Sequence, residues 1–80
     1  MDIKDKIVLR IKELCEQKEI KYNTLATNSG VTPSTVYSLL DERRKDISVL
    51  VLKKLCDGLE ISITDFFDSD IFRNLEQEIK

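Results

Sequence analysis

The chain has 80 residues, of which 41% are apolar and 35% are charged, which is enough for one small hydrophobic core in a single domain. It contains no histidine, so the commonest general base and the commonest metal ligand are both absent. Two cysteines, Cys15 and Cys56, are too few to hold a zinc ion alone. We therefore expect a protein that is not an enzyme, needs no cofactor and has no evident small-molecule ligand.

Charge and hydropathy also restrict where the protein acts. The longest apolar run, residues 49–52, has four residues, whereas a membrane helix needs about 20. Six of the first twelve residues are charged, so we expect no signal peptide, no membrane partner and a cytoplasmic protein. The net charge of −2 divides into +2 for residues 1–59 and −4 for residues 60–80. This balance argues against unspecific coating of nucleic acid but allows a local basic face.

With only two glycines and one proline, the chain has few turns, and its pattern predicts an all-α fold. Apolar residues three and four apart predict a first helix from about Ile3 to Lys18, with Asp2 as its N-cap. A second helix, barely two turns long, is predicted at about residues 22–28. Gly30 ends it, because glycine readily takes a left-handed conformation.

A third helix is predicted at about residues 33–41. Thr32 supplies a capping hydroxyl, and Pro33 suits the first helical position, where a missing N–H costs nothing. A polar connection follows, and Ser48 caps a fourth helix at about residues 49–59, whose apolar residues keep the helical spacing.

The C-terminal part of the chain predicts two more short helices. Ser62 begins a helix that ends in two phenylalanines, with Asp65 completing a capping-box pattern. Asp70 is the expected cap of a last helix, an acidic segment over residues 68–80 that continues the core through Phe72, Leu75 and Ile79. Two placements stay open for this segment: packing in a dimer, or folding back on its own bundle.

The most specific pattern is a short helix, a three-residue turn at residues 29–31 and a second helix. Gly30 permits the tight turn, Ala26 is small enough for the second helix to lie close over it, and Val31 and Val36 fill the wedge between the two helices. This pattern is typical of a helix-turn-helix, whose second helix enters the DNA major groove.

Similarity to a known family extends beyond the motif and covers nearly all of residues 5–67. The positions that carry it lie between residues 25 and 66. They are Leu25, Ala26, Gly30, Val31, Val36, Tyr37, Leu39, Ser48, Leu52, Leu55, Cys56, Leu59, Ile61, Ser62, Asp65 and Phe66. The sequence resembles the Cro/Xre (lambda-repressor-like) regulators of bacteria and phages. The resemblance implies a compact five-helix lambda-repressor-like DNA-binding bundle over residues 1–67, with the extra acidic helix of residues 68–80 as a possible dimer contact.

The same resemblance implies a repressor that binds a double-stranded DNA operator as a homodimer. By position, the base-contact candidates open the recognition helix or lie one turn later: Thr32, Pro33, Ser34, Thr35, Tyr37 and Ser38. The phosphate-contact candidates begin the second helix or follow the recognition helix: Tyr22, Asn23, Thr24, Arg43, Arg44 and Lys45.

Two departures from the family pattern affect these candidates. Tyr22 stands where many members have a phosphate-binding glutamine, and the Asn-Gly that often follows the recognition helix is missing. The exposed face of the recognition helix also lacks Arg, Asn and Gln, which make the strongest bidentate base contacts. We expect modest base readout, with DNA shape supplying part of the specificity.

Simpler interpretations accompany each functional one. The cysteines are expected to be buried thiols rather than a redox switch. Surface packing explains Tyr22 and Tyr37 as well as DNA contact does. The alternative for the basic residues 43–45 is a solvated loop. The bundle as a whole also allows an antitoxin-type regulator or a protein-interaction module. A steep loss of binding with rising salt would distinguish DNA binding from a hydrophobic protein interface.

Overall fold

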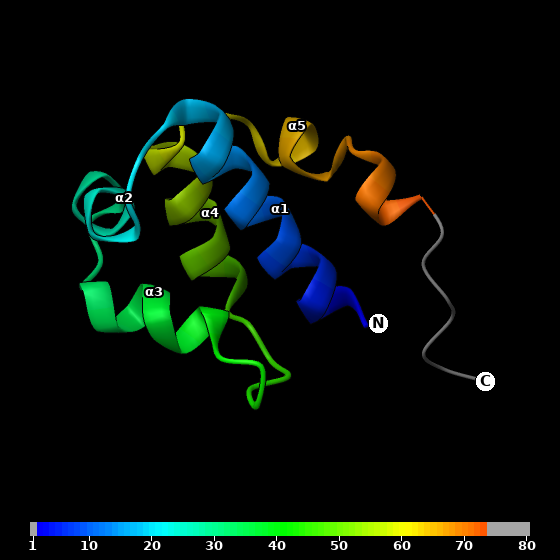
Figure 1. Cartoon of the computed structure of the whole chain (residues 1–80), viewed down its shortest axis with the longest axis horizontal. Coiled ribbons are helices and arrows are strands. Elements are labelled where there is room, and N and C mark those ends of the chain that lie inside the picture. The colour runs from blue at the N-terminus through cyan, green and yellow to red at the C-terminus, as the bar shows by residue number, and fades with distance from the viewer. Residues whose placement is uncertain (1, 74–80) are drawn as a thin grey trace.

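The computed structural model describes residues 2–73, which form five α-helices and one 3₁₀ turn, with no strand among them. The elements in chain order are α1 (Ile3–Lys18), α2 (Tyr22–Ser29), α3 (Pro33–Leu40), α4 (Val49–Gly58), α5 (Ile63–Phe67) and η1 (Asp70–Phe72). The α2 helix packs against α3 and α4, and η1 packs on α1. Figure 1 shows α2 and α3 at one end of the long axis and α5 with η1 at the other. The predicted all-α fold is confirmed.

Side-chain caps begin four of the five α-helices, at the positions the sequence predicts. Asp2 accepts the backbone N–H of Asp5 at 3.0 Å, and the Asp5 carboxylate accepts the N–H of Asp2 in return. Thr32, Ser48 and Ser62 each accept the N–H three residues ahead. Each cap satisfies an N–H that has no partner within its helix, so local sequence sets these helix starts.

Helix ends follow the prediction less closely. The α2 helix ends at Ser29, one residue later than predicted, and Gly30 takes the expected left-handed conformation at φ 72°. The α3 helix ends at Leu40, before the predicted end at Asp41. The Asp41 carboxylate accepts the backbone N–H of Arg43 at 2.9 Å, and this local turn replaces a further helical bond.

One hydrophobic core joins the helices. Its buried members in the described part of the chain are Ile7, Ile11, Leu14, Cys15, Leu25, Ala26, Val36, Leu39, Leu52, Leu55, Cys56, Leu59 and Phe66. Both cysteines are free and buried, as predicted, and burial raises the pKa of each thiol. Ala26 and Val36 are fully buried where α2 meets α3, while Val31 is half-buried against the same core.

Arg10 joins α1 to the end of α5. Its guanidinium donates to the carbonyl oxygens of Phe66 at 2.8 Å and Asp65 at 2.9 Å, and it forms an ion pair with Glu13 at 2.5 Å. The last carbonyls of a helix have no hydrogen-bond donor within that helix. Arg10 supplies donors to two such carbonyls of α5, which is only five residues long.

The segment after α5 folds back on this bundle as far as it is described. The ring of Phe72 lies 4.8 Å from that of Phe67 and 6.1 Å from that of Phe66. The cap of η1 is Ser69, whose hydroxyl accepts the N–H of Ile71, so the prediction of Asp70 as the cap is wrong. Residue 69 already has the extended backbone that a cap requires. Leu75 and Ile79 lie outside the described residues.

Candidate nucleic-acid interface

The turn between α2 and α3 is held by backbone hydrogen bonds. The N–H of Val31 donates to Ala26 at 3.1 Å, and that of Gly30 donates to Thr27 at 3.3 Å. Two residues later Pro33 opens α3, so only residues 30–32 separate the two helices. The geometry is that of a helix-turn-helix, with α3 as the second helix.

The first turn of α3 presents a cluster of hydroxyl groups. Thr32 Oγ1 lies 3.0 Å from Thr35 Oγ1 and 3.3 Å from Ser34 Oγ, and it also accepts the Thr35 N–H. Thr32, Pro33 and Ser34 are exposed, and Thr35 is half-buried. Four of the six predicted base-contact residues therefore lie together at one end of α3, with hydroxyl donors and acceptors but no charge.

A cleft connects this end of the recognition helix with the start of α4. It has a volume of about 190 Å³ and is lined in part by Thr35 and Ser38 of α3, by Arg44 of the turn and by Ser48. The structure therefore places two base-contact candidates of α3 beside one phosphate-contact candidate from the turn that follows α3.

Tyr22 and Tyr37 pack against each other. Their ring centroids are 6.1 Å apart and the ring planes are nearly perpendicular, an arrangement that aromatic pairs favour. Burial raises the pKa of the Tyr22 hydroxyl, whereas the Tyr37 side chain is 53% exposed. The two rings pack on each other, and a contact of either residue with DNA stays a prediction. Asn23 and Thr24 lie exposed beside them in the first turn of α2.

The phosphate-contact candidates Arg43, Arg44 and Lys45, called the basic turn below, follow α3 after two residues. Arg43 forms a two-point ion pair with Asp41, with Nη2–Oδ2 at 2.9 Å and Nε–Oδ1 at 3.1 Å. Hydrogen bonds from the Arg43 side chain and backbone lower the pKa of Asp41 to about 2. Two of the predicted cations already have acidic partners, because Lys45 lies 3.8 Å from Asp2 and 3.9 Å from Asp5.

One residue of this site was missed in the sequence analysis. Lys4 in the first turn of α1 is only 2% exposed, and its ammonium donates to the carbonyl oxygens of Asp41 at 2.9 Å and Arg44 at 2.7 Å. The sequence holds a signal for it: position 4 precedes Ile7 by three residues and Ile11 by seven, on the buried face of α1. A lysine on such a face needs buried hydrogen-bond acceptors.

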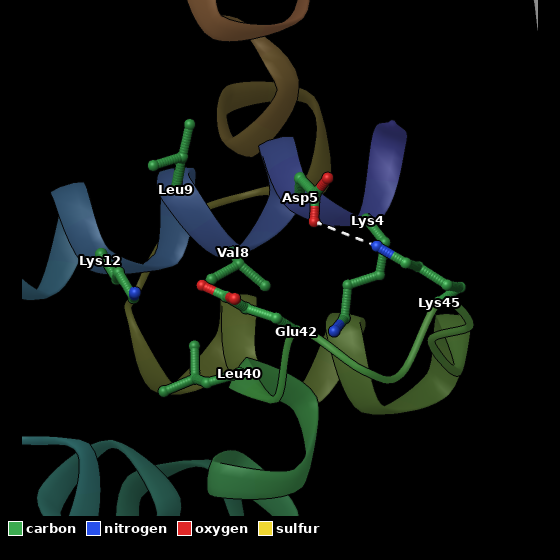
Figure 2. Close-up of a pocket in the computed structure, with 8 residues that line it drawn as sticks. All are labelled: Lys4, Asp5, Val8, Leu9, Lys12, Leu40, Glu42 and Lys45. Atoms are coloured by element: carbon green, nitrogen blue, oxygen red, sulfur yellow. Dashed lines mark ion pairs between the residues drawn. The ribbon is translucent and has the colours of Figure 1, made fainter. Parts of the chain in front are cut away.

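Figure 2 shows how α1 and the basic turn meet around a pocket of about 390 Å³. The side chain of Lys4 extends from α1 toward the turn, while Lys45 reaches back from the turn to Asp5. Val8, Leu9 and Leu40 form the apolar part of the pocket lining. The first turn of α1 thus contacts both the backbone and a side chain of the basic turn.

Residues 2–73 contain neither a cluster of three potential metal ligands nor a helix long and apolar enough to cross a membrane.

Comparison with known proteins agrees with this geometry. A family model described as the Cro/C1-type HTH DNA-binding domain matches residues 10–70. No match was found among curated proteins. A solved structure described as the crystal structure of the prophage Lp1 protein 11 is similar, with 29% sequence identity and a TM-score of 0.81. The alignment covers 94% of this chain and 100% of that chain. The chain belongs to the family of Cro/C1-type helix-turn-helix DNA-binding domains.

Proposed function

We propose that this protein is a transcriptional regulator, acting in the cytoplasm as a repressor, that binds a specific double-stranded DNA operator as a homodimer. The observation that carries the proposal is the position of the basic turn. It follows α3 after two residues, and its Arg44 shares a cleft with Thr35 and Ser38. A duplex that takes α3 into its major groove therefore meets cations at the adjacent backbone.

Base contacts in this proposal come from the hydroxyl cluster at the start of α3, together with Pro33, Tyr37 and Ser38. Hydroxyls donate to or accept from any base edge, and the methyl groups of threonine pack on thymine methyls. Such contacts discriminate weakly between bases, because α3 has no Arg, Asn or Gln side chain to form two hydrogen bonds with one base. Sequence-dependent shape and deformability of the duplex supply the remaining specificity.

Phosphate contacts come from the basic turn on one side of α3 and from the first turn of α2 on the other. The exposed Asn23 and Thr24 offer polar side chains and backbone N–H groups, while Tyr22 is restrained by its packing on Tyr37. Contacts on both sides of the recognition helix fix its position along the groove without reading sequence.

A homodimer of this type places two recognition helices about one DNA turn apart, roughly 34 Å, so that both meet the same side of the duplex. Residues 68–80 supply the proposed dimer contact. The operator is then an inverted repeat whose spacing reflects the two-fold axis of the protein.

The test is selection of bound duplexes from a random DNA pool by the purified protein, followed by sequencing. Enrichment of an inverted repeat with this spacing supports specific binding by a dimer. Enrichment of a single half-site supports DNA binding by a monomer and removes the dimer from the proposal. If nothing is enriched at low as well as moderate salt, the proposal is wrong and a protein-interaction module is favoured.

A further inference from the structure

We propose that Lys4 is a positioning residue of the DNA-binding surface: it fixes the backbone of the basic turn and so sets the affinity of the protein for duplex DNA. The inference rests on the proposed function, because it assumes that the turn contacts phosphate. It concerns α1, which lies outside the helix-turn-helix motif.

The geometry around the ammonium is the first argument. Lys4 Nζ donates to the carbonyl oxygens of Asp41 and Arg44, which lie 37 and 40 positions later in the sequence. One of them, the oxygen of Asp41, also accepts the N–H of Arg44 at 3.1 Å. Because three hydrogen bonds link the same short stretch, Lys4 fixes both ends of the turn that presents Arg43 and Arg44.

Burial is the second argument. A lysine at 2% exposure gives up its hydration, and a buried ammonium is tolerated when hydrogen bonds replace its water. Turn carbonyls are held at the required distance only if the turn adopts this one conformation. The cost of burying Lys4 therefore makes other conformations of the turn unfavourable.

The side chains of the turn give the third argument. The Arg43 side chain is 90% exposed although its backbone neighbours are bound to Lys4, so the backbone is fixed while the guanidinium faces solvent. A loop ordered before binding loses less entropy when it meets phosphate. Lys4 contributes to affinity by this route without contacting DNA itself.

The experiment replaces Lys4 by methionine, which keeps the unbranched stem and removes the donors. Binding to a fixed duplex is measured by fluorescence anisotropy over a range of salt concentrations. We expect K4M to weaken binding about 10-fold at low salt and to reduce the slope of log K against log salt by about one. The matched control is Lys53→Met, which removes one positive charge from an exposed, ion-paired position of α4 and should change binding less than about twofold.

A double-mutant cycle separates positioning from general loss of structure. In a protein carrying Arg43→Ala and Arg44→Ala, the added K4M substitution should cost no further affinity, since the groups that Lys4 positions are gone. An equal loss in both backgrounds overturns the inference. The inference is also overturned if K4M protein is folded by circular dichroism and binds DNA with the wild-type affinity and salt slope.

Two further outcomes have defined meanings. If K4M does not fold, Lys4→Gln takes its place, because it keeps most of the stem and one donor group, and the same cycle and criteria apply. If the wild-type protein itself binds no duplex at low salt, the proposed function fails. Wild-type binding that persists unchanged in the Lys4 variants refutes only the role of Lys4.

Discussion

A β-carbon placed on Gly58 would lie 2.1 Å from Oγ of Ser29 and 3.0 Å from its backbone nitrogen. The last turn of α4 and the end of α2 therefore approach each other at a distance that only a residue without a side chain permits. This contact lies directly before the turn at Gly30, so the position of the helix-turn-helix on the bundle depends on it.

We predict that Gly58→Ala lowers the free energy of unfolding by about 1–3 kcal/mol, as expected for an added methyl group that displaces backbone. Urea denaturation followed by circular dichroism measures the change. Ser29→Ala is the companion variant, because the buried Ser29 Oγ has no hydrogen-bond partner in the described structure. It should leave stability unchanged or raise it, and it should reduce the cost of Gly58→Ala. Equal stability of Gly58→Ala and wild type would contradict the close approach.

Glu19 ends α1 in the left-handed conformation, with φ 55°, which a side chain makes unfavourable. We predict that Glu19→Gly raises the free energy of unfolding by about 0.5–1 kcal/mol, because glycine accepts this conformation. The control is Glu16→Gly within the same helix, which should lower stability by about 1 kcal/mol. Thermal and urea unfolding of both variants give the sign of the change in the free energy of unfolding. Changes of the same sign in the two variants would refute the prediction.

The Arg43–Asp41 ion pair competes with phosphate for the same guanidinium. We predict that Asp41→Asn increases affinity for duplex DNA about two- to fivefold, since the amide still accepts the Arg43 N–H but no longer pairs with its charge. Glu42→Gln removes the same charge from the neighbouring exposed position and controls for net charge. Equal gains in the two variants would show that the ion pair has no specific effect.

The pH dependence of that effect follows from the pKa of Asp41, which Arg43 lowers from 3.8 to about 2. A carboxylate whose pKa is lower in the folded protein keeps its ion pair fully when the pH is above the unfolded-state pKa. It loses the pair as the pH falls through the folded-state pKa. The affinity ratio of Asp41→Asn to wild type should therefore stay constant from about pH 5 to about pH 8. A ratio that changes within this range would contradict the assigned pKa.

Ser34 and Ser38 test the base-contact assignment. Alanine at either position should reduce discrimination between the selected operator and a scrambled duplex more than it reduces affinity for the scrambled duplex. Electrophoretic mobility shift or anisotropy titrations with both duplexes measure the two effects. Asn28→Ala, an exposed change in α2 away from the start of α3, serves as a control. Uniform weakening on both duplexes would remove these serines from the base-contact set.

The thiols of Cys15 and Cys56 should react slowly with a thiol reagent while the protein is folded. Both are buried and burial raises their pKa values, so little accessible thiolate exists near neutral pH. Labelling followed by mass spectrometry should show rates that rise steeply across the urea transition. Rapid labelling of either cysteine in the native protein would contradict its placement in the core.

Local chemistry explains why so much of the fold was predictable. Asp2, Thr32, Ser48 and Ser62 cap helices through bonds to residues three positions away, so short sequence windows contain the whole signal. The end of α3 was placed less accurately, because the bond from Arg43 to Asp41 competes with the helix.

The sequence supplied candidate residues for the site but not their arrangement in space. Lys4 was missed because its acceptors lie 37 and 40 positions along the chain, beyond the reach of any local pattern. The pairing of Lys45 with Asp2 and Asp5 has the same cause. The contacts of each candidate with DNA stay predictions.

The edge-to-face contact of Tyr22 with Tyr37 also gives the protein an internal optical probe. The chain has two tyrosines and no tryptophan, so emission excited at wavelengths that phenylalanine does not absorb arises from the tyrosine pair at the junction of α2 and α3. Quenching of that emission reports on this junction alone, without a dye and without a background from other parts of the bundle.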